Sequence, residues 1–173
     1  LPERIDAGFL AMWNSLCRLQ RVVVIHANHA QELRAAADVH AALGALRSSG
    51  TMLLNQSVLL RGVNDSVAAL EDLSVALFES GVLPYYLHVL DPVRGAAHFD
   101  VPDDMARRLH AELTARLPGY LVPKLVREDS GAASKTMLTP ASRSARGSRC
   151  YYPGEFDITR ARRPSRPDPC LTG

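Results

Sequence analysis

The hydrophobic pattern of the chain alternates between two kinds of segment. Continuous apolar runs rich in β-branched residues are typical of buried strands, and apolar residues at helical spacing are typical of amphipathic helices. We expect strands over 21–26, 51–60, 83–90 and 120–123, and helices over 30–47, 67–79 and 102–117. This alternating order predicts an α/β fold with a parallel sheet and right-handed crossovers.

Polar residues interrupt three of the expected strands near their carboxyl ends. His26-Ala27-Asn28-His29 follows the first, Asn55-Gln56-Ser57 lies in or near the end of the second, and His88 and Asp91 lie on the third. Parallel sheets bind ligands at these ends, whereas polar groups within buried runs need hydrogen-bond partners. Two interpretations remain open: one shared site, or separate satisfaction of each residue by backbone groups.

Charge divides the chain into two parts. The 173 residues are 47% hydrophobic with a net charge of +2, which suffices for one domain with a core. Seven arginines and three acidic residues lie in 140–173 among Pro, Ser and Gly. We therefore expect a domain over 1–138 and a disordered, basic tail over 139–173. A solvated tail is favoured over a nucleic-acid-binding arm, because few aromatic residues lie among the arginines.

The cysteines are few and scattered. Cys17, Cys150 and Cys170 form neither a CxxC nor a CxxxCxxC motif, which argues against a zinc or iron–sulfur site within this sequence. His26 and His29 lack a third ligand nearby, so we expect no metal site.

Targeting signals are also lacking in the sequence. No signal peptide and no apolar run long enough to cross a membrane is present, so we expect a cytoplasmic protein without a membrane partner. The chain begins with Leu1 rather than Met, which leads us to expect a fragment or a processed product.

Lysine chemistry is restricted to two positions. Of the 20 basic residues only Lys124 and Lys135 are lysines. Lys135 follows a run of small residues over 131–134, where the backbone can approach a ligand. A lysine in such a loop is either a solvated surface residue or an amine that forms a Schiff base.

Several ordered motifs resemble a known family. They lie over 55–65, 84–91, 95–99, 119–123 and 134–136. Their order and spacing over about residues 2–138 are similar to the C-terminal half of the lysine 2,3-aminomutase family of radical S-adenosylmethionine enzymes. Three of these motifs most resemble the branch that makes (R)-β-lysine for modification of translation elongation factor P. Their sequences are His88-Val-Leu-Asp91, Gly95-Ala-Ala-His-Phe99 and Ser134-Lys-Thr136.

The resemblance implies a fold and a set of site residues. The fold would be the later half of an open (β/α) radical-SAM-type partial barrel. Lys135 would carry pyridoxal phosphate as an internal aldimine, and Asp91 and Glu128 would bind the distal ammonium of the substrate lysine. His26 and Gln56 would contact S-adenosyl-L-methionine.

The function implied is that of part of an L-lysine 2,3-aminomutase, an isomerase that converts (S)-α-lysine to (R)-β-lysine by a radical 1,2-amino shift. The ligands of the family's [4Fe–4S] cluster form a CxxxCxxC motif that this chain lacks, so we expect the isolated chain to be inactive. L-lysine, elongation factor P and its β-lysine ligase are the implied partners, and a homo-oligomer is left open. The alternative is a catalytically dead half-barrel that binds another chain, or that contacts RNA through its arginine-rich tail.

Overall fold

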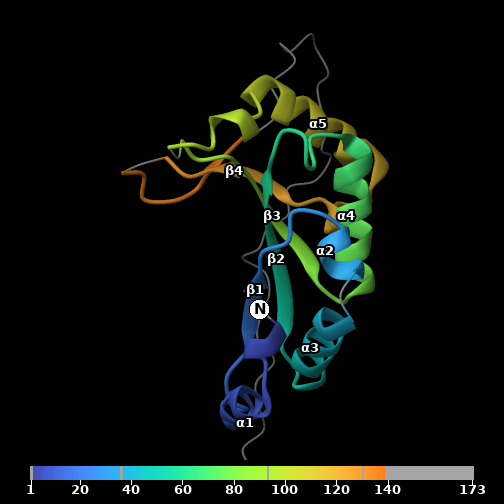
Figure 1. Cartoon of the computed structure of the whole chain (residues 1–173). Coiled ribbons are helices and arrows are strands. Elements are labelled where there is room, and N and C mark those ends of the chain that lie inside the picture. The colour runs from blue at the N-terminus through green and yellow to red at the C-terminus, as the bar shows by residue number, and fades with distance from the viewer. Residues whose placement is uncertain (1, 36, 93, 130, 139–173) are drawn as a thin grey trace, which may run out of the picture. The chain divides into compact units, whose positions relative to one another are not determined.

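The computed structural model describes residues 2–35, 37–92, 94–129 and 131–138 (Figure 1). The prediction for the tail over 139–173 lies outside the described residues. Within them no helix is long and apolar enough to cross a membrane.

The centre of the fold is a five-stranded sheet with the spatial order β1-β2-β3-β4-β5. The first four strands are parallel, and β5 is antiparallel to β4. Because the strand order follows the sequence, every crossover advances in the same direction, which is the topology of a barrel segment. The predicted α/β partial barrel is thus confirmed. The strands are β1 (Val22–Ile25), β2 (Met52–Leu59), β3 (Leu83–Val89), β4 (Lys124–Arg127) and β5 (Thr136–Met137).

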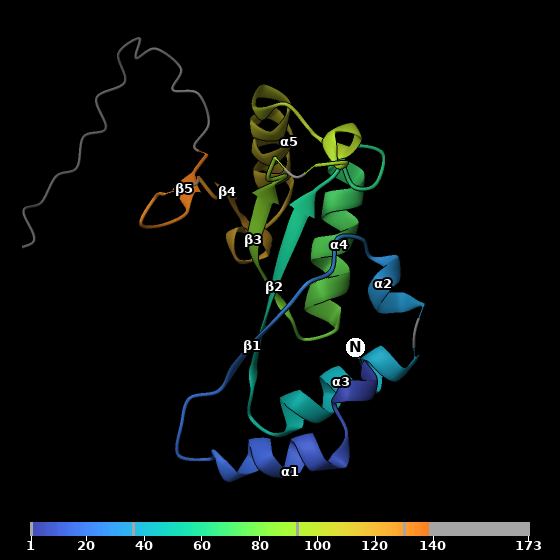
Figure 2. The ribbon, with the colours of Figure 1, turned by 60° about the vertical axis from the view of Figure 1, so that its left-hand side comes forward.

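The helices that connect the parallel strands lie on one side of the sheet (Figures 1 and 2). They are α2 (Gln31–Arg34), α3 (Ala37–Ser48), α4 (Val67–Glu79) and α5 (Asp103–Arg116). Helix α1 (Ala7–Ser15) precedes β1, and its Trp13 Nε1 donates a 2.7 Å hydrogen bond to Thr51 Oγ1 before β2. Helix α1 is therefore fastened near the amino end of β2, opposite the end where parallel sheets bind ligands.

Strand β2 shows how the sheet separates its two faces. Leu53 and Leu59 are buried and pack with the helices, whereas the alternate residues Gln56 and Val58 are only partly buried. We call the face away from the connecting helices the open face. It carries Val22, Val24 and Met52, each at least 40% exposed.

The helix expected over 30–47 is two helices, α2 and α3. At 100° per residue, Leu33 and Leu46 would lie about 140° apart on one straight helix. Both side chains are nevertheless buried in the same hydrophobic cluster. The break between the helices allows both to reach that cluster, and the alanines around it carry no signal for it.

The prediction of a strand over 120–123 is wrong, because the strand lies further along the chain. A 3₁₀ turn occupies Gly119–Leu121, and β4 begins at Lys124, which pairs with Tyr86. Pro123 has no N–H to contribute to the ladder, so the strand starts after it.

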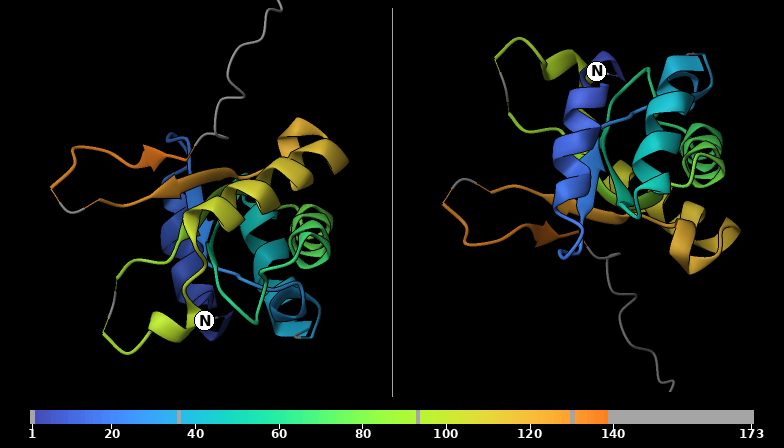
Figure 3. Two further views of the ribbon diagram at one scale, coloured as in Figure 1. Left: turned by 90° about the horizontal axis from the view of Figure 1, so that it is seen from above. Right: turned by 90° about the horizontal axis from the view of Figure 1, so that it is seen from below.

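A short hairpin follows, which the sequence did not indicate. After β4 the chain turns back and adds β5 against it, with Val126 paired to Met137 (Figure 3). This β4–β5 hairpin brings the residues after β4 close to those before β5.

Candidate active site

The polar residues of β2 divide between the two faces of the sheet. Asn55 and Ser57 are buried on the helix-covered face. Asn55 Oδ1 accepts from the Ala27 N–H at 2.9 Å, and both side chains donate to the Ala27 carbonyl, at 3.1 and 2.9 Å. For these two residues, separate satisfaction by the backbone is correct and the shared site is wrong.

Asn28 and Asn64 add further side-chain hydrogen bonds between the segment after β1 and strand β2. We call the bonds made by Asn55, Ser57, Asn28 and Asn64 the clamp. Asn28 Oδ1 accepts from the Val58 N–H at 2.7 Å, and Asn64 Nδ2 donates to the Asn28 carbonyl at 2.9 Å. Asn64 Oδ1 in turn accepts from the Leu60 N–H at 2.7 Å. The segment after β1 is therefore fastened to β2 by side chains, and His26 is held at the end of its strand.

His26 and Gln56 each follow one member of the last residue pair between β1 and β2. That pair is Ile25 with Asn55, and His26 comes directly after the end of β1. Gln56 belongs to the open face and His26 is exposed. His26 lines a separate, mostly apolar hollow of about 620 Å³ next to α2 and α3.

The β4–β5 hairpin joins the two residues that the family resemblance assigns to cofactor and substrate. Lys135 Nζ donates to Glu128 Oε1 across the hairpin. Thr136 Oγ1 donates to Asp129 Oδ2 at 2.6 Å, which closes the same turn. The hydrogen bond from Lys135, together with its positive charge, holds the pKa of Glu128 below its usual value.

His88 is the buried titratable group of the site. It is 9% exposed, and its Nδ1 lies 3.7 Å from Glu128 Oε1. Its Nε2 is buried and has no hydrogen-bond partner within the part of the chain that the structure describes. Burial, and next the charge of Lys135, lower the pKa of His88 from its ordinary value. The carboxylates of Glu128 and Asp91 act in the opposite direction, and His26 adds a smaller lowering effect. Four residues that the sequence analysis assigned to the site therefore act electrostatically on His88. They are Lys135, Glu128, Asp91 and His26.

Tyr86 is a site residue that the sequence analysis did not single out. Its ring lies 5.5 Å from Lys135 Nζ and 5.9 Å from Lys124 Nζ. It also contacts the edge of the His88 ring, with centroids 5.8 Å apart. The signal available in the sequence was its place two residues before His88, because side chains at this spacing share a face of a strand.

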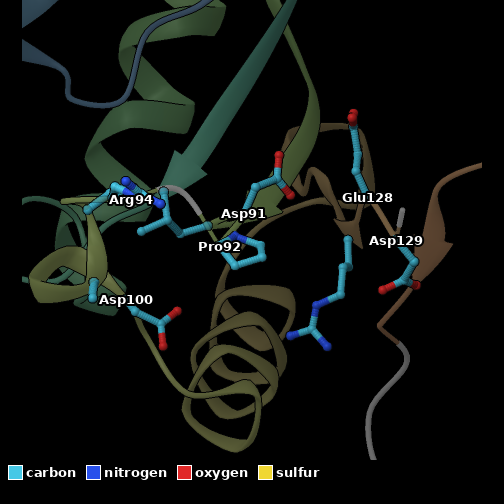
Figure 4. Close-up of a pocket in the computed structure, with 10 residues that line it drawn as sticks. Asp91, Pro92, Arg94, Asp100, Glu128 and Asp129 are labelled. Atoms are coloured by element: carbon cyan, nitrogen blue, oxygen red, sulfur yellow. The ribbon is translucent and has the colours of Figure 1, made fainter. Parts of the chain in front are cut away.

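A pocket of about 790 Å³ opens where β3 and β4 end. Asp91 and Glu128 both line it and extend to the same side of Pro92, whereas Asp100 lies on the other side (Figure 4). Arg94 and Arg127 also line the pocket. The pocket thus combines the two predicted ammonium ligands with basic groups, a composition that suits a ligand carrying both charges.

The arrangement supports amine chemistry. Lys135 presents a primary amine on a side chain that is 29% exposed, and the Glu128 carboxylate contacts it. Glu128 also lines the pocket together with Asp91. Among the described residues, no group of three or more His, Cys, Asp or Glu side chains is placed to hold a metal ion.

Fold and site together define a class: an α/β protein of barrel topology with a lysine-centred site at the carboxyl ends of its parallel strands. No family model matches the chain. An Escherichia coli protein named L-lysine 2,3-aminomutase is 56% identical over 138 residues, which is 80% of this chain. The chain belongs to the lysine 2,3-aminomutase family.

Other relatives agree. Proteins named L-lysine 2,3-aminomutase from Haemophilus influenzae and Clostridium subterminale are 45% and 36% identical over 138 and 141 residues. The alignments cover 79% and 81% of this chain. This chain spans 40% of the E. coli and H. influenzae proteins and 33% of the third. A solved radical SAM methyltransferase from Sphaerobacter thermophilus aligns with a TM-score of 0.46 and 23% identity, covering 68% of this chain and 38% of that one.

Proposed function

We propose that this chain is part of an L-lysine 2,3-aminomutase and supplies the cofactor lysine and the ammonium-binding carboxylates of its active site. The observation that carries the proposal is the contact of Lys135 with Glu128, a carboxylate that lines one pocket together with Asp91. The identity to proteins of that name supports it. The reaction proposed is the conversion of (S)-α-lysine to (R)-β-lysine.

Pyridoxal phosphate fits the residues around Lys135. The amine of Lys135 is accessible, the Tyr86 ring lies beside it, and the buried Nε2 of His88 lacks a partner that a bound group can supply. When bound through that amine, the cofactor supplies a conjugated ring that delocalises the unpaired electron during the amino shift. Lys135 anchors it, and Tyr86 and His88 border it.

The substrate contacts proposed are electrostatic. Asp91 and Glu128 bind the distal ammonium of L-lysine, because two carboxylates at one pocket favour a cation over a neutral group. His26, directly after β1, and Gln56, within β2, contact S-adenosyl-L-methionine. The [4Fe–4S] cluster that activates this co-substrate would be held by residues outside this sequence, which has three scattered cysteines.

We further propose that the product serves the modification of elongation factor P through its β-lysine ligase. The support is the sequence of the motifs over 88–91, 95–99 and 134–136, which resembles that branch of the family. Product analysis tests it: β-lysine formed by the complete enzyme should be transferred to elongation factor P by the ligase. Release of free β-lysine without transfer would contradict the proposal.

Selective labelling tests the role of Lys135. Reduction with borohydride in the presence of pyridoxal phosphate should attach the cofactor to Lys135 at least about tenfold more than to Lys124, as measured by peptide mass spectrometry. Lys124 is an internal control, since its Nζ lies 5.9 Å from the Tyr86 ring but contacts no carboxylate of the described residues. Equal labelling of the two lysines would refute the assignment.

A further inference from the structure

His88 is a buried residue to which the proposed function gives no role beyond a position next to the cofactor. It comes from β3, whereas Glu128 follows β4 and Lys135 precedes β5. Its Nδ1 lies 3.7 Å from the same carboxylate oxygen that accepts the hydrogen bond of Lys135. Strand β3 and the β4–β5 hairpin thus place an imidazole and an amine beside the same oxygen atom of the Glu128 carboxylate.

The chemistry of this group restricts what the imidazole can do. An ionised carboxylate accepts hydrogen bonds and donates none, so its charge favours the neutral tautomer of His88 that carries the proton on Nδ1. A protonated imidazole would compete with Lys135 for Glu128 and would repel the ammonium. The charge state of His88 is therefore coupled to that of the amine through Glu128.

We propose that His88 is a positioning residue that, when neutral, leaves Glu128 engaged with the Lys135 amine and, when protonated, withdraws that carboxylate and makes the amine more reactive. The inference rests on the proposed function, because it concerns the amine that would carry the cofactor. Its consequence is that the amine of Lys135 reacts more readily with an aldehyde, relative to the amine of Lys124, on the acidic side of the His88 titration.

Other charged and titratable groups act on His88 from several elements. Asp91, after β3, favours the protonated imidazole as Glu128 does, whereas His26, after β1, opposes it as Lys135 does. Tyr86 on the same strand contacts the ring at its edge. A variant of His88 therefore isolates its contribution while these groups stay in place.

Labelling with a small aldehyde tests the coupling in the full chain. Formaldehyde with cyanoborohydride methylates neutral amines, and the ratio of Lys135 to Lys124 methylation cancels the general effect of pH. We expect this ratio to rise about threefold as the pH falls through the His88 titration. The rise should disappear in His88→Gln and persist in His40→Gln, a control at an exposed histidine of α3.

A second measurement keeps the test independent of folding effects in His88→Gln. Titration of the His88 imidazole by NMR should give a lower pKa in Glu128→Gln and a higher pKa in Lys135→Gln than in the unmodified chain. A methylation ratio that still rises in folded His88→Gln, or a His88 titration unaffected by both other variants, would overturn the inference. Pyridoxal phosphate as the aldehyde tests the proposed function separately: equal labelling of both lysines alongside the formaldehyde response would reject the cofactor role and retain the coupling.

Discussion

Burial separates structural from functional polar residues along β2 and β3. Asn55 and Ser57 are adjacent in sequence to Gln56, yet they face the helices and bind the backbone of Ala27. His88 is also buried, at 9% exposure, but its Nε2 has no hydrogen-bond partner among the described residues. An unpartnered buried polar atom costs free energy, so at the residue scale it marks a position retained for a purpose other than stability.

The stability of the chain should depend on pH through His88. Its pKa in the folded chain lies below the ordinary value, so the unfolded chain binds a proton first as the pH falls. The free energy of unfolding should therefore be unaffected well above the ordinary imidazole pKa and should decrease as the pH falls from that value toward the folded one. Urea unfolding over this window measures it.

His88→Gln should flatten that part of the profile, and His40→Gln should leave it unchanged. Glu128 belongs to a lower window, because its lowered pKa contributes stability that is lost as the pH falls below the ordinary carboxyl range. An undiminished slope in His88→Gln would show that another group causes the dependence.

At the scale of elements, the clamp between the segment after β1 and strand β2 is built from side chains rather than from ladder hydrogen bonds. Asn55, Ser57, Asn28 and Asn64 each contribute to it. Side-chain hydrogen bonds of this kind replace the strand pairing that ends with Ile25 and Asn55. The clamp therefore positions His26 without taking part in chemistry.

Asn55→Ala should destabilise the chain by about 2 kcal/mol, because the buried N–H of Ala27 loses its acceptor. The matched variant Gln56→Ala, one residue along the same strand on the open face, should cost less than about 0.5 kcal/mol. Chemical denaturation of both variants measures the difference. Similar costs at the two positions would show that the clamp does not contribute as argued.

The β4–β5 hairpin is the element that assembles the lysine site. Glu128 and Lys135 are seven residues apart in sequence, and the antiparallel return of the chain brings their side chains into contact. Neither residue shows this partnership in its local sequence, since β5 contains two residues and has too little pattern to be predicted.

At the scale of the whole molecule, one face of the sheet is covered by helices and the other bears exposed apolar residues. Val22, Val24 and Met52 lie on the open face with 40–47% exposure. Such a surface favours association with other apolar groups. This chain spans 33–40% of the lengths of the three relatives named above.

The 173-residue chain alone should form no β-lysine, because its sequence lacks the cysteine motif proposed to hold the cluster. The assay is product formation after iron–sulfur reconstitution with pyridoxal phosphate and S-adenosyl-L-methionine, and a full-length relative serves as the positive control. Measurable β-lysine from the chain would show that cluster binding does not require that motif.

The alternation of the first four strands with connecting helices, the restriction of lysine chemistry to Lys124 and Lys135, and the family could all be predicted from the sequence. Periodicity and motif sequences are local properties, and they can be recognised wherever a segment is long, as in β2 or α4. The break between α2 and α3, the start of β4, the strand β5 and the contact of Lys135 with Glu128 became apparent in the folded chain alone. These depend on which buried surfaces and hydrogen-bond partners meet across the sheet, and such long-range contacts override local preference.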